Sequence, residues 1–364
     1  IPFCPVRKSF ILENEENSGM QGRIRKREIR MRIAFYSAKD YDKRFFDRQN
    51  RNGYEIDYFE ARLEPKTASL ARDHGVVCAF VQDDMSAETL KRLKERGVEL
   101  IALRCAGFNN VDLDKAAELG MTVVRVPAYS PYAVAEHTMG LMLALNRKIH
   151  RAHNRIIEHN FSLKGLLGFD MHGKNVGVVG AGNIGRTVMD ILLGFGCNVL
   201  CYAHHERRDY KERGVKFVPL KELFERSDII TLHVPLTPET RHMIDEQSMS
   251  LMRDGVMIVN TSRGKVVDTA AMIESLKSGK VGYFGMDVYE EEGDVFYRDL
   301  SEHVIEDDVL ARLMTMPNVL ITGHQGYFTR EALEAIADTT LKNISDFDQG
   351  REPENEVTAE EHTD

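Results

Sequence analysis

Three stretches of the sequence end an apolar run with side chains that can carry charge or protons. "VNTSRGKVVD" places Arg263 just beyond the run "VMIVN", and "ITGHQGYFT" places His324 after another run. "GMDVYEEE" ends a third run with carboxylates at Asp287, Glu290, Glu291 and Glu292. An arginine presents a planar fork that matches an organic carboxylate, and a histidine can exchange a proton near neutral pH. Together they could bind an organic acid and protonate an oxygen on it.

Each of these groups, taken alone, has an ordinary structural explanation. Arg263 would suit a surface turn, the acidic residues a solvated loop, and His324 the end of a strand. The carboxyl ends of parallel strands, however, meet at the edge where open α/β sheets bind their ligands. We therefore expect one cleft to gather the three stretches.

A glycine motif predicts a dinucleotide site. "NVGVVGAGNIGRTVMDILLGFG" spaces Gly180, Gly182 and Gly185 as G-x-G-x-x-G, between an apolar strand and an amphipathic helix. A second strand, "NVLCYA", follows within the same unit. The glycines allow a tight turn and close approach to a pyrophosphate, and the helix N-terminus supplies N–H donors for the anion. A glycine-rich turn without a ligand is the alternative.

The stretch "CYAHHERRD" bears on which dinucleotide is bound. Eighteen residues after Gly185 the chain reaches Ala203, near where an acid would accept bonds from the adenosine ribose of NAD. That carboxylate is missing, and the neighbouring side chains could bind a 2′-phosphate instead. These are His204, His205, Arg207 and Arg208. We expect use of NADPH, alone or alongside NADH, with a solvated charged loop as the competing interpretation.

The elements that must position these residues follow an alternating pattern. From residue 31 onward, short apolar runs such as "RIAFYSA", "GVVCAFV" and "DIITLHVP" alternate with helical segments. Such alternation predicts parallel strands joined by right-handed crossovers. Residues 128–160 show a long helical pattern with Pro131 in its first turn, long enough to bridge two lobes.

Composition excludes several classes of protein. The chain has 364 residues, 48 basic and 57 acidic, and its net charge of −9 argues against nucleic-acid binding. No apolar run approaches the roughly 20 residues that span a bilayer. The five cysteines lack the spacing of a metal site, so we expect no metal and reduced, buried thiols in a cytoplasmic protein.

The two ends of the chain differ from the rest. Residues 1–30 contain the charge run "RIRKREIR" but no apolar signal segment, so we expect a disordered extension with Met31 as a natural start. The segment after Gly350, residues 351–364, is acidic, and we expect it to be a loose tail.

Several motifs together resemble one known family. "AYSPYAVAEH", "VGVVGAGNIGR", "HVPLTPET", "VNTSRG", "GMDVYEEE" and "TGHQGYFT" resemble the D-2-hydroxyacid dehydrogenases, and among them the fermentative D-lactate dehydrogenases. The resemblance runs from about Met31 to about Gly350. It implies two doubly wound parallel-sheet α/β domains, with a Rossmann cofactor domain inserted into a flavodoxin-like substrate domain. The implied bounds are 31–127 plus 324–350 for the substrate domain and 128–323 for the cofactor domain.

The resemblance also implies roles for particular residues. Arg263 would grip the substrate carboxylate and polarise the keto oxygen, and His324 would be the general acid and base, paired with Glu292. A neighbouring carboxylate keeps such a histidine charged at neutral pH. The substrate would also meet the backbone at Ala106 and Gly107, with Tyr129 and Tyr327 lining the pocket. The sequence departs from the family at Ala203, where the usual Asp is absent. From the glycine motif, the stretch after Ala203 and the resemblance together, the predicted cofactor contacts are Gly180, Gly182, Asn183, Ile184, Gly185, Ala203, His204, His205, Arg207, Arg208, Val234, Pro235, Thr261 and Asp287.

The implied activity is the reversible reduction of pyruvate to D-lactate with NAD(H) or NADP(H). A long interval between Glu292 and His324 is typical of the lactate branch, and Tyr129, Tyr327 and Phe328 could narrow the pocket for a small substrate. The alternatives are a dehydrogenase for a bulkier 2-oxo acid and a dinucleotide-sensing interaction scaffold. We also expect a homodimer or a dimer of dimers, since "AVAEHTMGLMLALNRKIH" could form an apolar seam, although a helix between domains would look the same.

Overall fold

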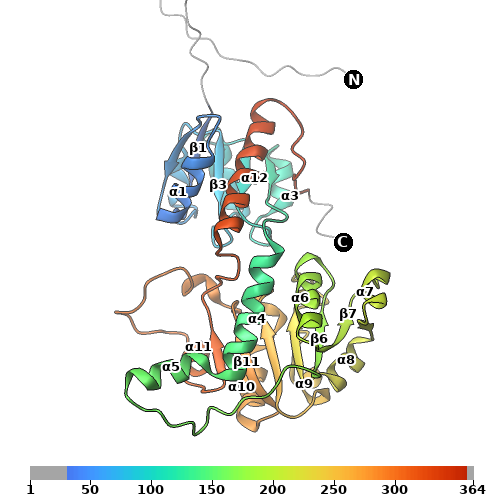
Figure 1. Ribbon diagram of the computed structural model, residues 1–364. Coiled ribbons are helices and arrows are strands. Elements are labelled where there is room, and N and C mark those ends of the chain that lie inside the picture. The colour runs from blue at the N-terminus through green and yellow to red at the C-terminus, as the bar shows by residue number, and fades with distance from the viewer. Residues whose placement is uncertain (1–30, 359–364) are drawn as a thin grey trace, which may run out of the picture.

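The computed structural model describes residues 31–358 of the chain (Figure 1). The predicted extension over residues 1–30 and the end of the predicted tail, residues 359–364, lie outside the described residues. Two parallel β-sheets form two lobes, one above the other in Figure 1, with helices around each. This is the predicted fold class.

The first sheet has the strand order β2-β1-β3-β4-β5, which is the flavodoxin-like order. Its strands are β1 (Arg32–Phe35), β2 (Glu55–Tyr58), β3 (Val76–Ala79), β4 (Leu100–Leu103) and β5 (Thr122–Val124). The inner strands β3 and β4 read VVCA and LIAL and are buried throughout, because helices cover both faces of the sheet. The helical elements of this lobe are α1 (Asp40–Gln49), η1 (Thr67–Ala71), α2 (Ala87–Lys94), α3 (Leu113–Glu118) and α12 (Arg330–Asp348).

The second sheet has the order β12-β11-β10-β9-β6-β7-β8. Counted from β6, this is the Rossmann order 3-2-1-4-5-6 with one further strand at the edge. Its strands are β6 (Asn175–Val179), β7 (Asn198–Tyr202), β8 (Lys216–Phe217), β9 (Ile229–Leu232), β10 (Val256–Asn260), β11 (Val281–Met286) and β12 (Val319–Ile321). Its helical elements are α6 (Asn183–Gly194), α7 (Arg208–Glu212), α8 (Leu220–Arg226), α9 (Glu246–Leu251), η2 (Gly264–Val266), α10 (Thr269–Ser278), η3 (Glu292–Asp294) and α11 (Asp308–Met314).

The single long helix predicted over residues 128–160 is wrong. The chain forms α4 (Pro131–Arg147) and α5 (Ile149–Ile157), separated by Lys148, whose φ of 51° is left-handed. Helix α4 packs against α6 and β11 and rises toward the upper lobe (Figure 1), whereas no residue of α5 is buried. The local apolar pattern continues across the break, so only these tertiary contacts distinguish the two helices.

The predicted loose tail is wrong over the part that the structure describes. Val357 is buried, and its N–H donates to the carbonyl of Val123 at 2.8 Å. The carbonyl of Asn355 accepts from Arg125 N–H at 3.0 Å, so the segment lies antiparallel along the edge strand β5. Val357 joins the hydrophobic core of the upper lobe, and β5 offers a free edge for pairing, so this acidic segment is ordered against the lobe.

The remaining expectations concern thiols, membranes and metals. Cys78, Cys105, Cys197 and Cys201 are buried free thiols, as predicted, and Cys4 lies outside the described residues. Within residues 31–358, no helix combines the length and apolar character that a bilayer crossing needs. The same residues contain no cluster of three side chains suited to a metal ion.

Candidate active site

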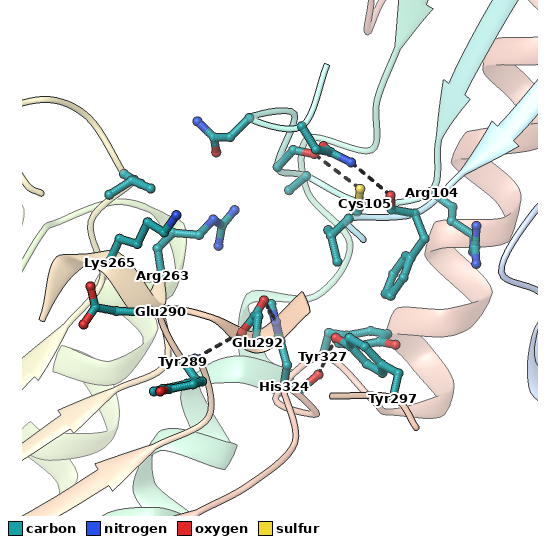
Figure 2. A pocket seen from close by; sticks show the side chains of 18 of the residues that line it. Arg104, Cys105, Arg263, Lys265, Tyr289, Glu290, Glu292, Tyr297, His324 and Tyr327 are labelled. Atoms are coloured by element: carbon teal, nitrogen blue, oxygen red, sulfur yellow. Dashed lines mark hydrogen bonds and ion pairs between the residues drawn. The ribbon is translucent and has the colours of Figure 1, made fainter. Parts of the chain in front are cut away.

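The loops of both lobes enclose a cavity of about 300 Å³ (Figure 2). The upper lobe contributes residues that follow β3 and β4, and the lower lobe contributes residues that follow β9, β10 and β11. The lining includes Phe80, Arg104, Ala106, Gly107, Asn109, Tyr129, Arg263, Lys265, Glu290, Glu292, Tyr297, His324 and Tyr327. Three side chains singled out from the sequence, Arg263, Glu292 and His324, therefore share one cavity.

Arg263 reaches the cavity from a turn that buried polar groups hold in shape. The side chain of Asn260 donates to the carbonyl of Arg263 at 2.9 Å and accepts from the N–H and hydroxyl of Ser262. Across the cavity, a Cβ placed on Gly107 would lie 2.9 Å from Nη2 of Arg263. The guanidinium thus lies against the backbone of the other lobe, and a larger residue at position 107 would make the end of the Arg263 side chain shift.

The imidazole of His324 is bound at Nδ1 by a carboxylate. Nδ1 of His324 donates to Oε1 of Glu292 at 2.9 Å, and Oε2 of Glu292 accepts from the N–H of Tyr289 at 3.1 Å. The bond to Nδ1 leaves Nε2 as the ring nitrogen that can exchange a proton with a ligand. A guanidinium can bind the carboxylate of an organic acid. An imidazole on the same cavity can then protonate another oxygen of that molecule.

The other carboxylates of "GMDVYEEE" have different surroundings. Glu290 accepts from the N–H of Thr269 at 2.9 Å and pairs with Nε2 of His242 at 2.7 Å, which ties it to the start of α10. Glu291 is exposed. Glu292 is therefore the carboxylate of this run that contacts His324.

Asp287 is 2% exposed and holds the turn that carries His324. Its carboxylate accepts from the hydroxyl of Thr322 at 2.6 Å and from the N–H groups of Gln325 and Gly326 at 2.9 and 2.7 Å. Nε2 of His137 lies 3.3 Å from the same carboxylate. Burial alone would raise the pKa of Asp287, but the hydrogen bonds from His137, Thr322 and Gln325 outweigh burial and lower it.

A second cavity of about 180 Å³ adjoins the first, and Tyr129, Arg263, His324 and Tyr327 line both. It is lined further by the predicted cofactor contacts Ile184, Val234, Pro235, Thr261 and Asp287. His233 also lines it, and burial lowers the pKa of that imidazole to about 3, so His233 is neutral at pH 7. His324 is the histidine that lines both cavities.

The glycine motif has the shape that a dinucleotide needs. Helix α6 begins at Asn183 with Gly182 as its N-cap, and no atom lies within 4 Å of a Cβ placed on Gly182. A Cβ on Gly185 would lie 2.0 Å from the carbonyl oxygen of Gly180, so glycine is required for the helix to pack this closely. The open space beside Gly182 at the start of the helix fits a pyrophosphate.

Ala203 directly follows β7, and the basic residues after it point into solvent. His204, His205, Arg207 and Arg208 are exposed and line neither cavity described above. Arg207 pairs with Asp209 at 3.3 Å and Arg208 with Glu212 at 3.0 Å. The loop is therefore exposed to solvent, as the competing interpretation of its charged residues expected. No acidic side chain directly follows β7, because Ala203 occupies that position.

Comparison with known proteins shows the family. The family model described as D-isomer specific 2-hydroxyacid dehydrogenase, NAD binding domain, matches residues 139–326. The chain is 52% identical over 328 residues to a D-lactate dehydrogenase from Escherichia coli, covering 90% of this chain and 100% of that protein. The chain belongs to the D-isomer specific 2-hydroxyacid dehydrogenase family. It is therefore an oxidoreductase, and its Rossmann domain is an NAD-binding domain.

Two further relatives extend the comparison. A 2-hydroxyacid dehydrogenase homolog from Schizosaccharomyces pombe is 55% identical over 319 residues, covering 87% of this chain and 96% of that protein. The apo-structure of the E. coli D-lactate dehydrogenase matches with a TM-score of 0.83, 50% identity and coverage of 90% and 100%. The structure of a pyruvate reductase from Chlamydomonas reinhardtii matches with a TM-score of 0.85, 42% identity and coverage of 90% and 98%.

One aromatic side chain of this dehydrogenase does not lie where the sequence suggested. Tyr129 and Tyr327 line both cavities, but Phe328 is 48% exposed and packs against the ring of Tyr41 at 4.8 Å between centroids. Both residues lie in the turn before α12, and only Tyr327 lines the two cavities.

Sequence reasoning missed several residues that line the dehydrogenase's cavity. Arg104 is 3% exposed, and its guanidinium lies 4.5 and 4.7 Å from the ring centroids of Phe35 and Phe80. An arginine ending the apolar run "ELIALRC" was the available signal. Lys265 adds a second cation beside Arg263, and Tyr297 comes from a connection with no regular pattern.

Replacing Asp287 by asparagine tests the buried carboxylate. The folded-state pKa lies below the ordinary value of 3.8, so the carboxylate stabilises the fold above that pH, and the contribution disappears as pH falls through the lowered value. Asp287→Asn should lower the free energy of unfolding at pH 7 by about 1.5–3 kcal/mol, the worth of hydrogen bonds to a charged group. Urea unfolding between pH 7 and 2 should show a flatter acid limb for the variant. Parallel pH profiles for the two proteins would contradict this role.

Proposed function

We propose that this dehydrogenase reduces pyruvate to D-lactate, reversibly, with His324 as general acid and base. This substrate is supported by relatives and solved structures named D-lactate dehydrogenase. Their sequences are 50–52% identical to this chain and cover 90% of it. The observation that carries the proposal is the placement of Arg263 and the His324–Glu292 pair on one cavity, next to the cavity lined by the predicted cofactor contacts.

Arg263 binds the substrate carboxylate and aims the keto group. Its guanidinium lies beside Gly107, so the backbone at Ala106 and Gly107 and the guanidinium can hold one carboxylate from two lobes. A planar, bidentate grip fixes the orientation of the neighbouring carbonyl carbon. A lysine here would keep the charge but lose that orientation.

His324 and Glu292 handle the proton. Negative charge develops on the keto oxygen during reduction, and Nε2 of His324 protonates that oxygen while Nδ1 stays bonded to Glu292. Glu292 stabilises the charged imidazole and fixes the ring so that Nε2 faces the cavity. The bound nicotinamide supplies the hydride, and Ile184, Val234 and Thr261 would hold that ring next to Arg263 and His324.

A bulkier 2-oxo acid is the second candidate substrate. The cavity of about 300 Å³ has an aromatic side formed by Phe80, Tyr129, Tyr297 and Tyr327, which could pack against a longer apolar side chain. Rates measured with pyruvate and with branched and aromatic 2-oxo acids separate the two, and the proposal requires the highest kcat/KM for pyruvate.

We propose that NADPH is used alongside NADH. The support is the absence of an acid at Ala203 and the exposed imidazoles of His204 and His205, which can donate to a 2′-phosphate when protonated. Arg207 and Arg208 belong to the same stretch, but their guanidinium groups already pair with the carboxylates of Asp209 and Glu212. Because imidazoles gain charge at lower pH, affinity for NADPH relative to NADH should increase as pH falls.

We further propose a homodimer whose seam involves α5 rather than α4. Met139, Met142 and Leu145 of α4 are buried inside the chain, so these side chains of the seam that the sequence suggested are not available to a partner. The apolar side chains of α5 and the segment after it are exposed instead, with Leu163 at 82% and Leu167 at 86%. A second copy covering this face would explain their exposure, and sedimentation of the purified protein at micromolar concentration measures whether it forms.

His324→Ala tests the proposed reaction. The variant should lose roughly 10²-fold or more in kcat for pyruvate reduction, the usual worth of a positioned acid. The assay follows dinucleotide absorbance with pyruvate, and His303→Ala, which changes an exposed histidine, serves as the control. Unchanged turnover in the His324 variant would remove that residue from the mechanism.

Ala203→Asp tests the proposed cofactor choice. The new carboxylate should accept bonds from the ribose hydroxyls and repel a 2′-phosphate, which shifts the ratio of kcat/KM values toward NADH. The ratio is measured for both proteins across pH. A ratio that does not move would show that position 203 does not face the ribose, and a strong, pH-independent preference of the unmodified protein for NADH would contradict NADPH use.

A further inference from the structure

The connection that carries Glu292 belongs to the lower lobe but is bound by side chains of the upper lobe. We call residues 292–297 the strap; they follow β11 and include η3. The side-chain amide of Gln82 donates to the carbonyls of Phe296 at 3.3 Å and Glu292 at 3.5 Å. Arg62 donates to the carbonyl of Gly293 at 3.1 Å, and Lys39 to that of Tyr297 at 3.3 Å.

Tyr297 joins the end of the strap directly to His324. Its hydroxyl donates to the carbonyl of His324 at 2.9 Å (Figure 2). Its ring packs edge-on against Phe80 of the upper lobe, with 5.3 Å between the ring centroids. Tyr297 and His324 have φ angles of 64° and 51°, a left-handed conformation that costs free energy for residues other than glycine. The hydroxyl bond therefore links two residues with left-handed backbones, and one of them, His324, also contacts Glu292.

We propose that Gln82 and Tyr297 are positioning residues for the general acid. Gln82 fixes the backbone from which Glu292 reaches Nδ1 of His324, and Tyr297 fixes the backbone of His324 itself. Contact between the lobes and the orientation of the imidazole are thereby coupled, because one short segment takes part in both. The inference rests on the proposed role of His324 and Glu292.

Two conservative variants test this coupling. Tyr297→Phe removes one hydroxyl, and Gln82→Met removes the amide at nearly constant length. Tyr36→Phe is the matched control for the first, because Tyr36 also donates to a backbone carbonyl, that of Thr67, at 2.9 Å, but inside the upper lobe. Gln247→Met, at an exposed position of α9, is the control for the second.

The positioning role predicts a specific kinetic pattern. Each test variant should lose about three- to tenfold in kcat for pyruvate, about the worth of one hydrogen bond, while KM and the Kd for NADH stay within about twofold. The controls should keep kcat. On a Glu292→Gln background, Tyr297→Phe should cost less than about twofold more, because both changes act through the same imidazole.

The outcomes separate this inference from the proposed function. If Tyr297→Phe and Gln82→Met lower the melting temperature as Tyr36→Phe does but keep kcat, the contacts are only structural and the inference is wrong. Fully multiplicative losses in the double variant would also overturn it. If His324→Ala retains turnover, the proposed function itself fails, whatever the strap variants do.

Discussion

A buried carboxylate supports the turn that carries His324, the proposed general acid. Asp287 directly follows β11 and accepts three hydrogen bonds from the turn after β12, so two neighbouring strands are joined at their carboxyl ends. The turn so fixed carries His324, whose own N–H donates to the carbonyl of Asp287 at 2.7 Å. The lower lobe thus presents its imidazole on a rigid support, and the donors around Asp287 compensate for the free energy of burying its charge.

The two sheets supply complementary halves of one site. The Rossmann sheet brings Arg263, Glu292 and His324 to its edge, and the flavodoxin-like sheet brings the backbone at Gly107 and the ring of Phe80 to face them. A cavity between lobes can exclude water when a substrate is bound, which strengthens the electrostatic interactions inside it. The strap is part of the lower lobe, and side chains of the upper lobe bind it. The orientation of His324, the proposed general acid, therefore depends on both lobes.

The sequence was most informative where function depends on local pattern. The G-x-G-x-x-G spacing, the strand series and the chemical residues at strand ends are all short-range features. With the family resemblance they predicted the fold class, and they singled out Arg263, Glu292 and His324, which line one cavity. What it could not predict depends on distant contacts. The break at Lys148, the pairing of Val357 with β5 and the burial of Arg104 between two rings follow from packing between segments far apart in the chain. Tyr297 likewise gains its place from Phe80, more than two hundred residues away.

The central claim is that one guanidinium and one imidazole act on the same small acid. Replacing Arg263 by alanine tests it most directly, with steady-state rates for pyruvate and NADH binding measured on the same preparation. The account predicts that kcat/KM for pyruvate falls by at least about 10²-fold, through both KM and kcat, because the carbonyl loses its orientation. NADH should bind within about twofold of its original affinity, on the scale of measurement error for an unaffected site. A loss confined to NADH affinity, with pyruvate kinetics intact at saturating NADH, would contradict it.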